Sequence, residues 1–178
     1  MSEAADLNDW FNAADVADRL HFRAASFCMG DSTDFDSWDQ GISFFLPNMT
    51  WLQPPGYVHQ MVDRSWQPNA LNVTGAGSDS AFSAQKSDDG KTVVLRYVNY
   101  GADEVKVTVT LTSGSAGGSS SPTLVQMWTI ASDDPDAANS PANPTAVSPV
   151  GPVSVPGFAS GSTLMVKPSS YTVVVMTF

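Results

Sequence analysis

The stretch EVKVTVTL, residues 104–111, decides the fold class of the second half of the chain. Valine or leucine occupies every second position after the glutamate, and lysine or threonine lies between them. Because successive side chains of a strand point to opposite faces, this alternation predicts a half-buried antiparallel strand. One of its faces should therefore pack on an apolar core.

Further runs rich in Val, Thr, Tyr and Leu surround this stretch beyond residue 66. They are Ser80–Ser87, Thr92–Asn99, Thr123–Ile130, Thr163–Lys167 and Tyr171–Thr177. Turn sequences at Asp88–Gly90 and Asn99–Asp103 separate neighbouring runs, as in hairpins. Ser113–Pro122 is typical of a flexible loop, and the prolines of Asp133–Pro156 exclude that stretch from central strands. These features predict an antiparallel β-sandwich over residues 67–178.

The first 66 residues have a different character. An apolar stripe at helical spacing predicts an amphipathic helix from Glu3 to about Phe22, and Pro54–Arg64 predicts a second helix. Between them, Ala24–Met29 and Ile42–Leu46 are apolar runs, the first of them typical of a buried parallel strand. Since a barrel that begins mid-circle cannot close, we expect a partial α/β segment that resembles the end of a (β/α)8 barrel. The fold class is therefore mainly β, with this segment in front of the sandwich.

Charge and composition exclude several classes of partner. The 178 residues carry 18 acidic and 8 basic side chains, a net charge of -10, which argues against nucleic acid and anionic membranes. No apolar run approaches the roughly 20 residues that a membrane span needs, and the first residues lack the pattern of a signal peptide. The single cysteine, Cys28, cannot form an internal disulfide. The compartment stays open, a secreted parent protein being one alternative.

An ordered series of short motifs runs along most of the chain. The motifs are the helix from Glu3, then 24–27, 38–45, 54–61, 91–99, 138–144 with Val147 and Pro149, and 167–173. Together they resemble the C-terminal region of the α-L-arabinofuranosidases of glycoside hydrolase family 51. The resemblance implies a (β/α)8 catalytic barrel that ends near residue 66, followed by a jelly-roll-like sandwich. It also implies retaining hydrolysis of terminal α-L-arabinofuranosyl groups in arabinan and arabinoxylan. The two catalytic glutamates would belong to earlier barrel strands, ahead of Met1.

The resemblance also suggests where sugar would be contacted. Gln40 matches a glutamine at the mouth of the barrel, where a carboxamide can donate to and accept from sugar hydroxyls, and Trp38 could add a stacking face. The alternative is a loop glutamine beside a core tryptophan. Retaining hydrolysis needs two carboxyl groups about 5–5.5 Å apart, but the only glutamates, Glu3 and Glu104, are distant in sequence. We therefore expect no catalytic residue in this chain and no glycosidase activity of the chain alone.

Other constellations favour structural roles. The acidic loop could gather calcium ligands, but it lacks the EF-hand order, so a solvated loop without metal is expected; its carboxylates are Asp31, Asp34, Asp36 and Asp39. No metal and no cofactor is predicted. Histidines on helix faces usually pack or hydrogen-bond, and a cysteine within an apolar run is usually buried. Tryptophans that are dispersed in sequence more often belong to the core than to a sugar-stacking surface. These residues are His21, His59, Cys28, Trp10, Trp51, Trp66 and Trp128.

Two functions remain open at this point. In the first, the chain is the C-terminal part of an α-L-arabinofuranosidase-like enzyme, and an arabinose-containing polysaccharide or oligosaccharide meets it through a complete barrel. In the second, it is a free-standing, non-catalytic β-sandwich module that binds a glycan or a protein partner. If residues 1–66 need a missing barrel, the isolated chain should expose an apolar face and self-associate. A monomeric, cooperatively folded chain would favour the module.

Overall fold

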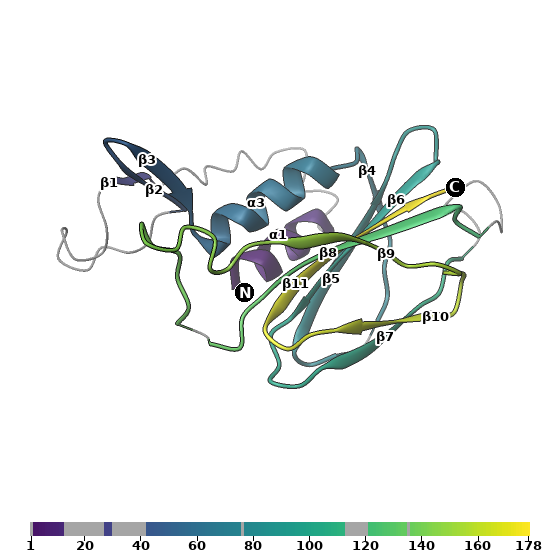
Figure 1. The fold of residues 1–178 in the computed structure, drawn as a ribbon. Coiled ribbons are helices and arrows are strands. Elements are labelled where there is room, and N and C mark those ends of the chain that lie inside the picture. Colours follow the sequence, from purple (N-terminus) through teal and green to yellow (C-terminus); the bar gives the residue numbers. More distant parts are fainter. Residues whose placement is uncertain (1, 13–26, 30–41, 76, 113–120, 135) are drawn as a thin grey trace.

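The structure of the protein is a computed structural model that describes residues 2–12, 27–29, 42–75, 77–112, 121–134 and 136–178. Within these ranges the helices are α1 (Ser2–Asn12) and α3 (Pro54–Ser65), drawn in Figure 1. The strands are β1 (Phe27–Met29), β2 (Ser43–Leu46), β3 (Met49–Leu52), β4 (Asn69–Leu71), β5 (Ser80–Lys86), β6 (Thr92–Asn99), β7 (Val105–Val109), β8 (Leu124–Ala131), β9 (Val150–Ser154), β10 (Ser162–Val166) and β11 (Ser170–Thr177). No helix in the described ranges is long and apolar enough to cross a membrane.

Six strands form one antiparallel sheet in the order β4-β5-β6-β11-β8-β9. β11 lies inside this sheet and pairs along its whole length with β6 on one side and β8 on the other. Its sequence, SYTVVVMT, is rich in β-branched residues, which suit a strand covered on both faces. Tyr171, Val173 and Val174 are each at most 2% exposed. Both faces of β11 are therefore buried, and the mainly β, antiparallel fold class is confirmed.

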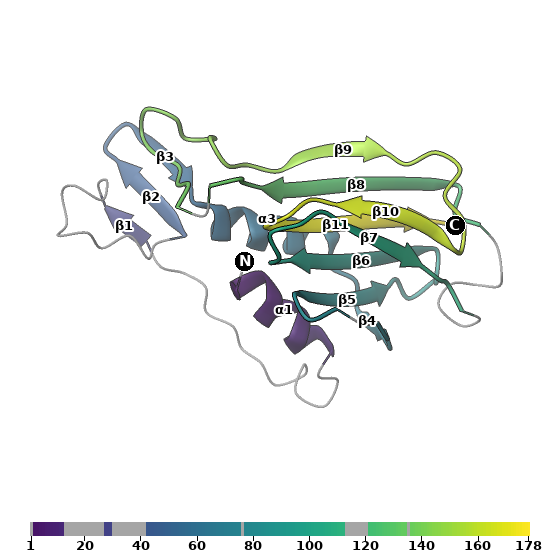
Figure 2. The ribbon, with the colours of Figure 1, turned by 90° about the horizontal axis from the view of Figure 1, so that it is seen from below.

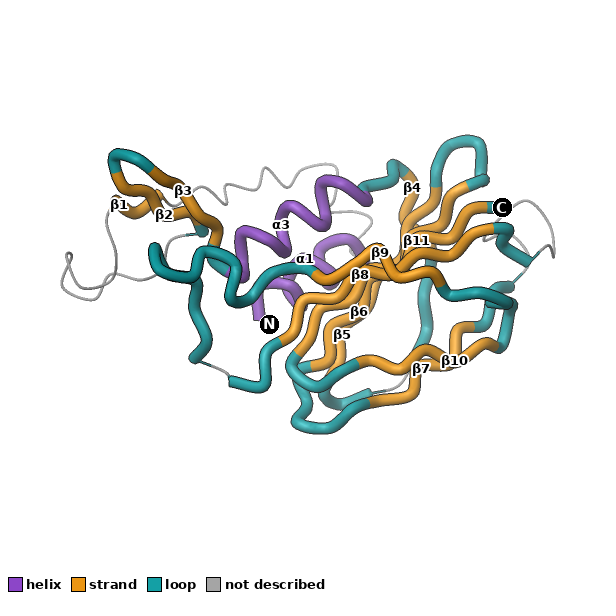
Figure 3. Tube along the Cα trace, in the orientation of Figure 1, coloured by secondary structure: helices purple, strands orange, loops and turns teal. Residues whose placement is uncertain are grey.

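A second layer, formed by β7 and β10, lies on one face of the six-stranded sheet (Figures 1 and 3). In β7, Val107 and Val109 are half-buried, whereas Lys106 and Thr108 are exposed, so the predicted alternation is confirmed. The core between the layers is apolar; its buried residues are Val93, Val125, Phe158, Leu164, Val174 and Met176. The burial of these side chains holds the two layers together.

Helices α1 and α3 cover the opposite face of the six-stranded sheet (Figure 1). Their apolar sides supply Ala4, Leu7, Val58 and Met61 to a buried cluster. The sheet supplies the other buried members, which are Ala81, Val94, Val98, Ile130, Tyr171 and Val173, with Val147 from a loop. α1 confirms the first predicted helix as far as Asn12, and residues 13–22 of that prediction lie outside the described residues. α3 confirms the second helix, and proline begins it because the missing N–H needs no partner at that position.

β1, β2 and β3 form a separate three-stranded sheet beside the helices (Figure 1). β1 runs parallel to β2, as the apolar run at residues 24–29 predicted for a strand of a parallel sheet. β2 and β3 form an antiparallel hairpin through Pro47 and Asn48. The segment thus combines one parallel and one antiparallel pairing ahead of α3.

Three strands were not predicted from the sequence. β3 and β4 are short, and β9 lies in the proline-rich stretch that was expected only to cross the surface. β9 pairs with β8 alone, and all five of its residues are exposed. Pro152 is tolerated there because an edge strand needs fewer backbone donors than a central one. The stretch therefore stays out of the centre of the sheet, but it does add an edge strand.

The predicted hairpin between β5 and β6 is confirmed. Gly90 N donates to Ser87 O at 3.0 Å, and Gly90 has a φ of +69°. Glycine adopts this left-handed conformation without the steric cost that a Cβ atom brings. The turn sets the register in which β5 and β6 pair from Lys86 and Val93 onward.

Candidate functional site

The two residues predicted to contact sugar, Trp38 and Gln40, lie outside the described residues, so their role stays a prediction. The acidic loop with Asp31, Asp34, Asp36 and Asp39 also lies outside them, and so does His21. In the described part of the chain, no group of three or more His, Cys, Asp or Glu side chains could hold a metal ion. Glu104 is exposed just before β7.

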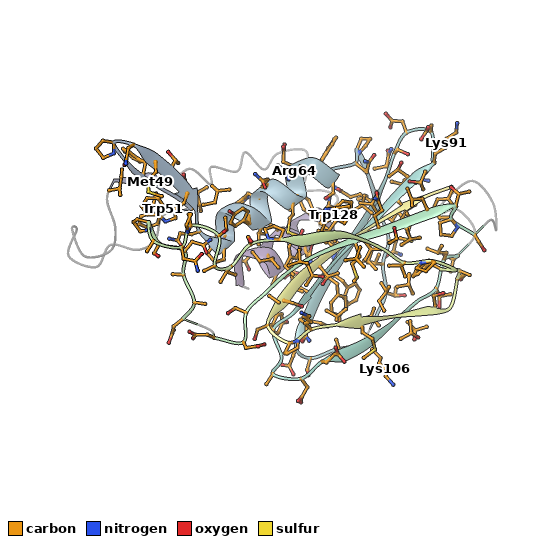
Figure 4. All side chains as sticks on the ribbon, in the orientation of Figure 1. Met49, Trp51, Arg64, Lys91, Lys106 and Trp128 are labelled. Carbon is orange, nitrogen blue, oxygen red and sulfur yellow. The ribbon has the colours of Figure 1, made fainter. Side chains whose placement is uncertain are left out.

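The described tryptophans do not form one platform. Trp51 is 4% exposed and stacks on Phe44, with ring centroids 5.8 Å apart. Trp128 is half-buried against the core under the helices, and Trp66 is 53% exposed. Figure 4 shows Trp51 in the β2–β3 hairpin and Trp128 over the six-stranded sheet. These side chains therefore act separately, and a shared sugar-stacking surface is not built from them.

Asn139 is the most densely bonded side chain of the segment between β8 and β9. Its Nδ2 donates to Leu52 O at 2.7 Å and to Val147 O at 2.9 Å, and its Oδ1 accepts from Val147 N at 2.7 Å. With 3% exposure, the side chain is shielded from water. It therefore bridges the end of β3 to the loop ahead of β9.

The backbone of Asn139 completes this bridge. Its N–H donates to Gln53 Oε1 at 2.9 Å, and its carbonyl accepts from Gln53 Nε2 at 2.7 Å and from Trp51 Nε1 at 3.2 Å. We call these three residues, together with Leu52 and Val147, the Asn139 cluster. It joins the β2–β3 hairpin and the start of α3 to the sandwich. Residues 138–144 belong to the motifs that carry the family resemblance, but nothing in their pattern predicts this role.

Arg96 is a buried cation inside β6. It is 0% exposed, and its guanidinium donates to Gln85 Oε1 at 2.7 Å, to Ser65 O at 2.9 Å and to Ser65 Oγ at 3.1 Å. The guanidinium carbon also lies 5.2 Å from the ring centroid of Phe11, a cation–π distance. Arg96 thus ties the end of α3 and the end of α1 to the sheet. The signal in the sequence was a charged residue inside the apolar run TVVLRYVN.

Tyr171 lies under the same helices. Its hydroxyl is buried and has no hydrogen-bond partner among the described residues. Burial raises the pKa of the phenol well above its ordinary value of 10.0, and the positive charge of Arg96 opposes this in part. The raised pKa means that the folded state holds the phenol proton at a pH where the unfolded chain releases it.

We expect this phenol to make the fold sensitive to alkali. A group with a raised folded-state pKa contributes fully below the unfolded value near 10.0 and loses that contribution as pH rises toward the folded value. The free energy of unfolding should therefore fall above pH 10, with a limiting slope of about 1.4 kcal/mol per pH unit. Tyr171→Phe should remove this slope and, by deleting an unpaired buried hydroxyl, add about 1 kcal/mol at neutral pH. Urea unfolding of both proteins from pH 8 to 11 tests this; equal slopes would contradict it.

A groove of about 570 Å³ lies between the two layers of the sandwich, beside β7. One wall is the extended segment after β4, residues 71–75, and the other is residues 106–112. The floor is apolar and consists of Phe82, Ala84, Val93, Leu95, Tyr97 and Met176. Figure 2 shows the cause: β7 runs along β6, and β5 and β4 extend past it without a strand above them.

These features define a fold: a two-layer antiparallel sandwich, covered on one face by helices and preceded by a short α/β sheet. A scan against protein-family profiles found no match, and a search of curated proteins found none either. The comparison with solved structures therefore carries the assignment of the fold.

In the search of solved structures, the fold of this chain is similar to that of α-L-arabinofuranosidases of glycoside hydrolase family 51. An arabinose-bound enzyme of this family matches 84% of the chain with a TM-score of 0.66 and 13% identity. The thermostable enzyme from Thermotoga petrophila RKU-1 matches 76% with a TM-score of 0.62 and 18% identity. The arabinose complex of the α-L-arabinofuranosidase from Thermotoga maritima matches 78% with a TM-score of 0.63 and 17% identity. The chain spans 23–32% of the length of these proteins. The resemblance drawn from the sequence is thus confirmed at the level of the fold.

Proposed function

We propose that these 178 residues are the C-terminal part of an α-L-arabinofuranosidase-like glycoside hydrolase. The complete enzyme would remove terminal α-L-arabinofuranosyl residues from arabinan and arabinoxylan. The observation that carries the proposal is the fold: 76–84% of the chain matches enzymes described as α-L-arabinofuranosidases, at TM-scores of 0.62–0.66. Residues 1–66 would be the last elements of the catalytic barrel, and residues 67–178 the sandwich.

Within this proposal the chain supports the active site and does not perform the chemistry. The Asn139 cluster and Arg96 hold the α/β segment on the sandwich, so the sandwich would brace the last barrel elements. Gln40 and Trp38 would reach the sugar from the loop that precedes β2. The acid/base and nucleophile would come from two carboxyl groups about 5–5.5 Å apart, supplied by the rest of the barrel.

The test is hydrolysis of 4-nitrophenyl α-L-arabinofuranoside. We expect no rate above buffer for the purified 178-residue chain, because it lacks the paired carboxylates that retention requires. A longer polypeptide that joins this chain to the rest of a catalytic barrel should hydrolyse this substrate. In that polypeptide, Gln40→Ala should lower kcat/KM by about tenfold, the loss of one hydrogen bond to sugar.

Gln60→Ala is the matched control, since it removes the same kind of side chain from helix α3, to which no contact with sugar is assigned. It should leave kcat/KM unchanged within about twofold. Hydrolysis by the isolated chain would overturn the proposed lack of activity. An upstream sequence that encodes no βα units with glutamates at strand ends would overturn the proposed enzyme.

A second function is favoured by one specific observation. Helices α1 and α3 bury Leu7 and Met61 in a cluster shared with the six-stranded sheet, so the start of the chain already has a partner within the chain. This supports a free-standing module that binds a glycan or a protein without catalysis. Sedimentation and thermal unfolding separate the two functions. A monomer that unfolds in one cooperative step and is retarded by arabinan in an affinity gel supports the module.

A further inference from the structure

The edge of β7 beside the groove exposes backbone hydrogen-bonding groups. Val109 O accepts from Gly161 N at 2.8 Å, and Leu111 N donates to Ser160 Oγ at 2.9 Å, so these odd-numbered residues turn their polar groups toward β10. Successive residues of a strand direct their backbone N–H and C=O groups alternately to one edge and to the other. The N–H and C=O groups of Lys106, Thr108 and Thr110 therefore face the groove, and no described strand pairs with them.

The opposite wall and the floor limit what can enter. Segment 71–75 continues β4 in extended form, with Leu71 and Val73 half-buried and Asn72 and Thr74 exposed. Phe82 and Tyr97 stack on the floor with centroids 6.1 Å apart. A Cβ atom at Gly75 would lie 2.6 Å from Phe82 Cζ, so the backbone of this wall already rests on that ring. Little aromatic surface is therefore available for a sugar ring to stack on.

An extended polypeptide fits this combination of walls and floor. Unpaired strand edges are templates for a further strand, and alternate apolar side chains of that strand would cover the floor. Both walls are chain segments, and the space between them is about 570 Å³. A strand in this space would extend the second layer beyond β7, over the half-buried side chains of Phe82, Leu95 and Tyr97.

Charge argues for a partner other than a second copy. The residues that line the groove include one cation, Lys106, and no carboxylate, on a chain of net charge -10. Lys106 points away from the six-stranded sheet at the rim of the groove (Figure 4). A strand with a carboxylate on its outer face would pair with it across the strands. Two copies of this acidic chain would repel each other.

From these observations we infer that the groove is a strand-accepting site for an extended segment of another polypeptide. That segment has apolar residues at alternate positions facing Phe82, Leu95 and Tyr97, and an acidic residue on its outer face opposite Lys106. It pairs with the open edge of β7. The site is independent of the proposed hydrolase function, because it needs neither Gln40 nor a barrel.

The probe is the synthetic peptide Ac-Thr-Val-Thr-Val-Asp-Val-Thr-Val-Thr-NH2, titrated into the full 178-residue chain up to about 1 mM. We expect saturable binding by calorimetry and slower hydrogen exchange of the Thr108 and Thr110 amides in the complex. An N-methylated version of the peptide, which lacks backbone donors, should not bind.

Thr108→Pro removes the N–H that faces the groove and should weaken peptide binding by about tenfold. Thr163→Pro is its matched control. Thr163 pairs with Thr108 in the same ladder, and the two hydroxyls lie 3.3 Å apart, so both variants lose the same side-chain contact. Only Thr108 borders the groove, so Thr163→Pro should bind the peptide within about twofold of the unchanged protein.

Lys106→Glu keeps the test decisive even if the proline variants do not fold. It should weaken binding of the Asp peptide by about threefold and strengthen binding of the same peptide with Lys in place of Asp. Four results would overturn the inference: no binding of the peptide, equal binding by Thr108→Pro and Thr163→Pro, dimerisation that the peptide reverses, or displacement of the peptide by arabino-oligosaccharides. The third would assign the groove to a second copy, and the fourth to a glycan.

Discussion

Arg96→Ala is expected to lower the free energy of unfolding by about 3–5 kcal/mol. The substitution leaves a cavity where a 0% exposed side chain lay. It also removes the guanidinium donor from the buried Ser65 O, and it leaves Gln85 Oε1 with only the N–H of Gln67 at 3.2 Å. An unpaired buried acceptor costs about 1–3 kcal/mol. Urea unfolding followed by circular dichroism at neutral pH measures the loss.

Arg64→Ala provides the matched control. Arg64 is exposed in the last turn of α3 and points to solvent in Figure 4, so its removal should change stability by less than about 0.5 kcal/mol. Arg96→Met separates the effect of the cavity from that of the lost hydrogen bonds. It restores much of the side-chain volume but none of the guanidinium donors. We expect it to recover only part of the loss. If Arg96→Ala were as stable as Arg64→Ala, the guanidinium would not join the helices to the sheet.

Much of the sandwich could be predicted from sequence because the determinants are local. The alternation at residues 104–111 places Val107 inward and Thr108 outward, and the burial of β7 follows this order. Asp89 and Gly90 mark the turn between β5 and β6. The strand bounds were predicted to within one or two residues wherever a β-branched run ended at a turn sequence.

The strands that were missed lack this local signal. β9 includes Gly151 and Pro152, two residues that normally argue against a strand, and it exists because β8 offers an edge. β3 follows a Pro47–Asn48 turn, but at four residues it is too short for an alternation to stand out. Pairing with β8 across the proline-rich stretch decides β9, whereas β3 pairs with β2 directly before it.

The same reasoning applies to the buried polar residues. Asn139 bonds to residues 86–88 positions away, and Arg96 reaches Ser65 across 31 positions. No spacing rule connects such partners, so sequence analysis noted their surroundings without finding their roles. Gln40 and Trp38 were predicted through the resemblance to arabinofuranosidases, and they lie outside the described residues. Their contact with sugar is therefore still to be tested.

The position of these polar residues explains how one chain combines two kinds of architecture. Apolar burial under α1 and α3 is non-directional and would tolerate sliding of the helices on the sheet. Hydrogen bonds from Arg96 and Asn139 are directional and permit one arrangement. The α/β segment is thus set on the sandwich by a few polar contacts, and these contacts are where substitutions should have the largest effects.

Asn139→Ala is expected to lower the free energy of unfolding by about 3 kcal/mol, because it removes three side-chain hydrogen bonds at a 3% exposed position. Asn139→Asp should cost at least as much despite its equal size. A carboxylate cannot donate to Leu52 O and Val147 O, and it would place a charge against two carbonyl oxygens. Chemical unfolding at pH 7 measures both variants. Asn143→Ala, in the same loop but exposed, is the control and should stay within about 0.5 kcal/mol.

Hydrogen exchange separates a local effect from a global one. If the Asn139 cluster is what holds the β2–β3 hairpin on the sandwich, the amides of residues 43–52 should lose protection in Asn139→Ala before those of β6 and β11. β11 is paired on both sides and buried on both faces, so its amides should exchange only on global unfolding. Uniform loss of protection would mean that the hairpin and the sandwich open as one unit. Unchanged protection at residues 43–52 would mean that apolar contacts such as Phe44 on Trp51 suffice to hold the hairpin.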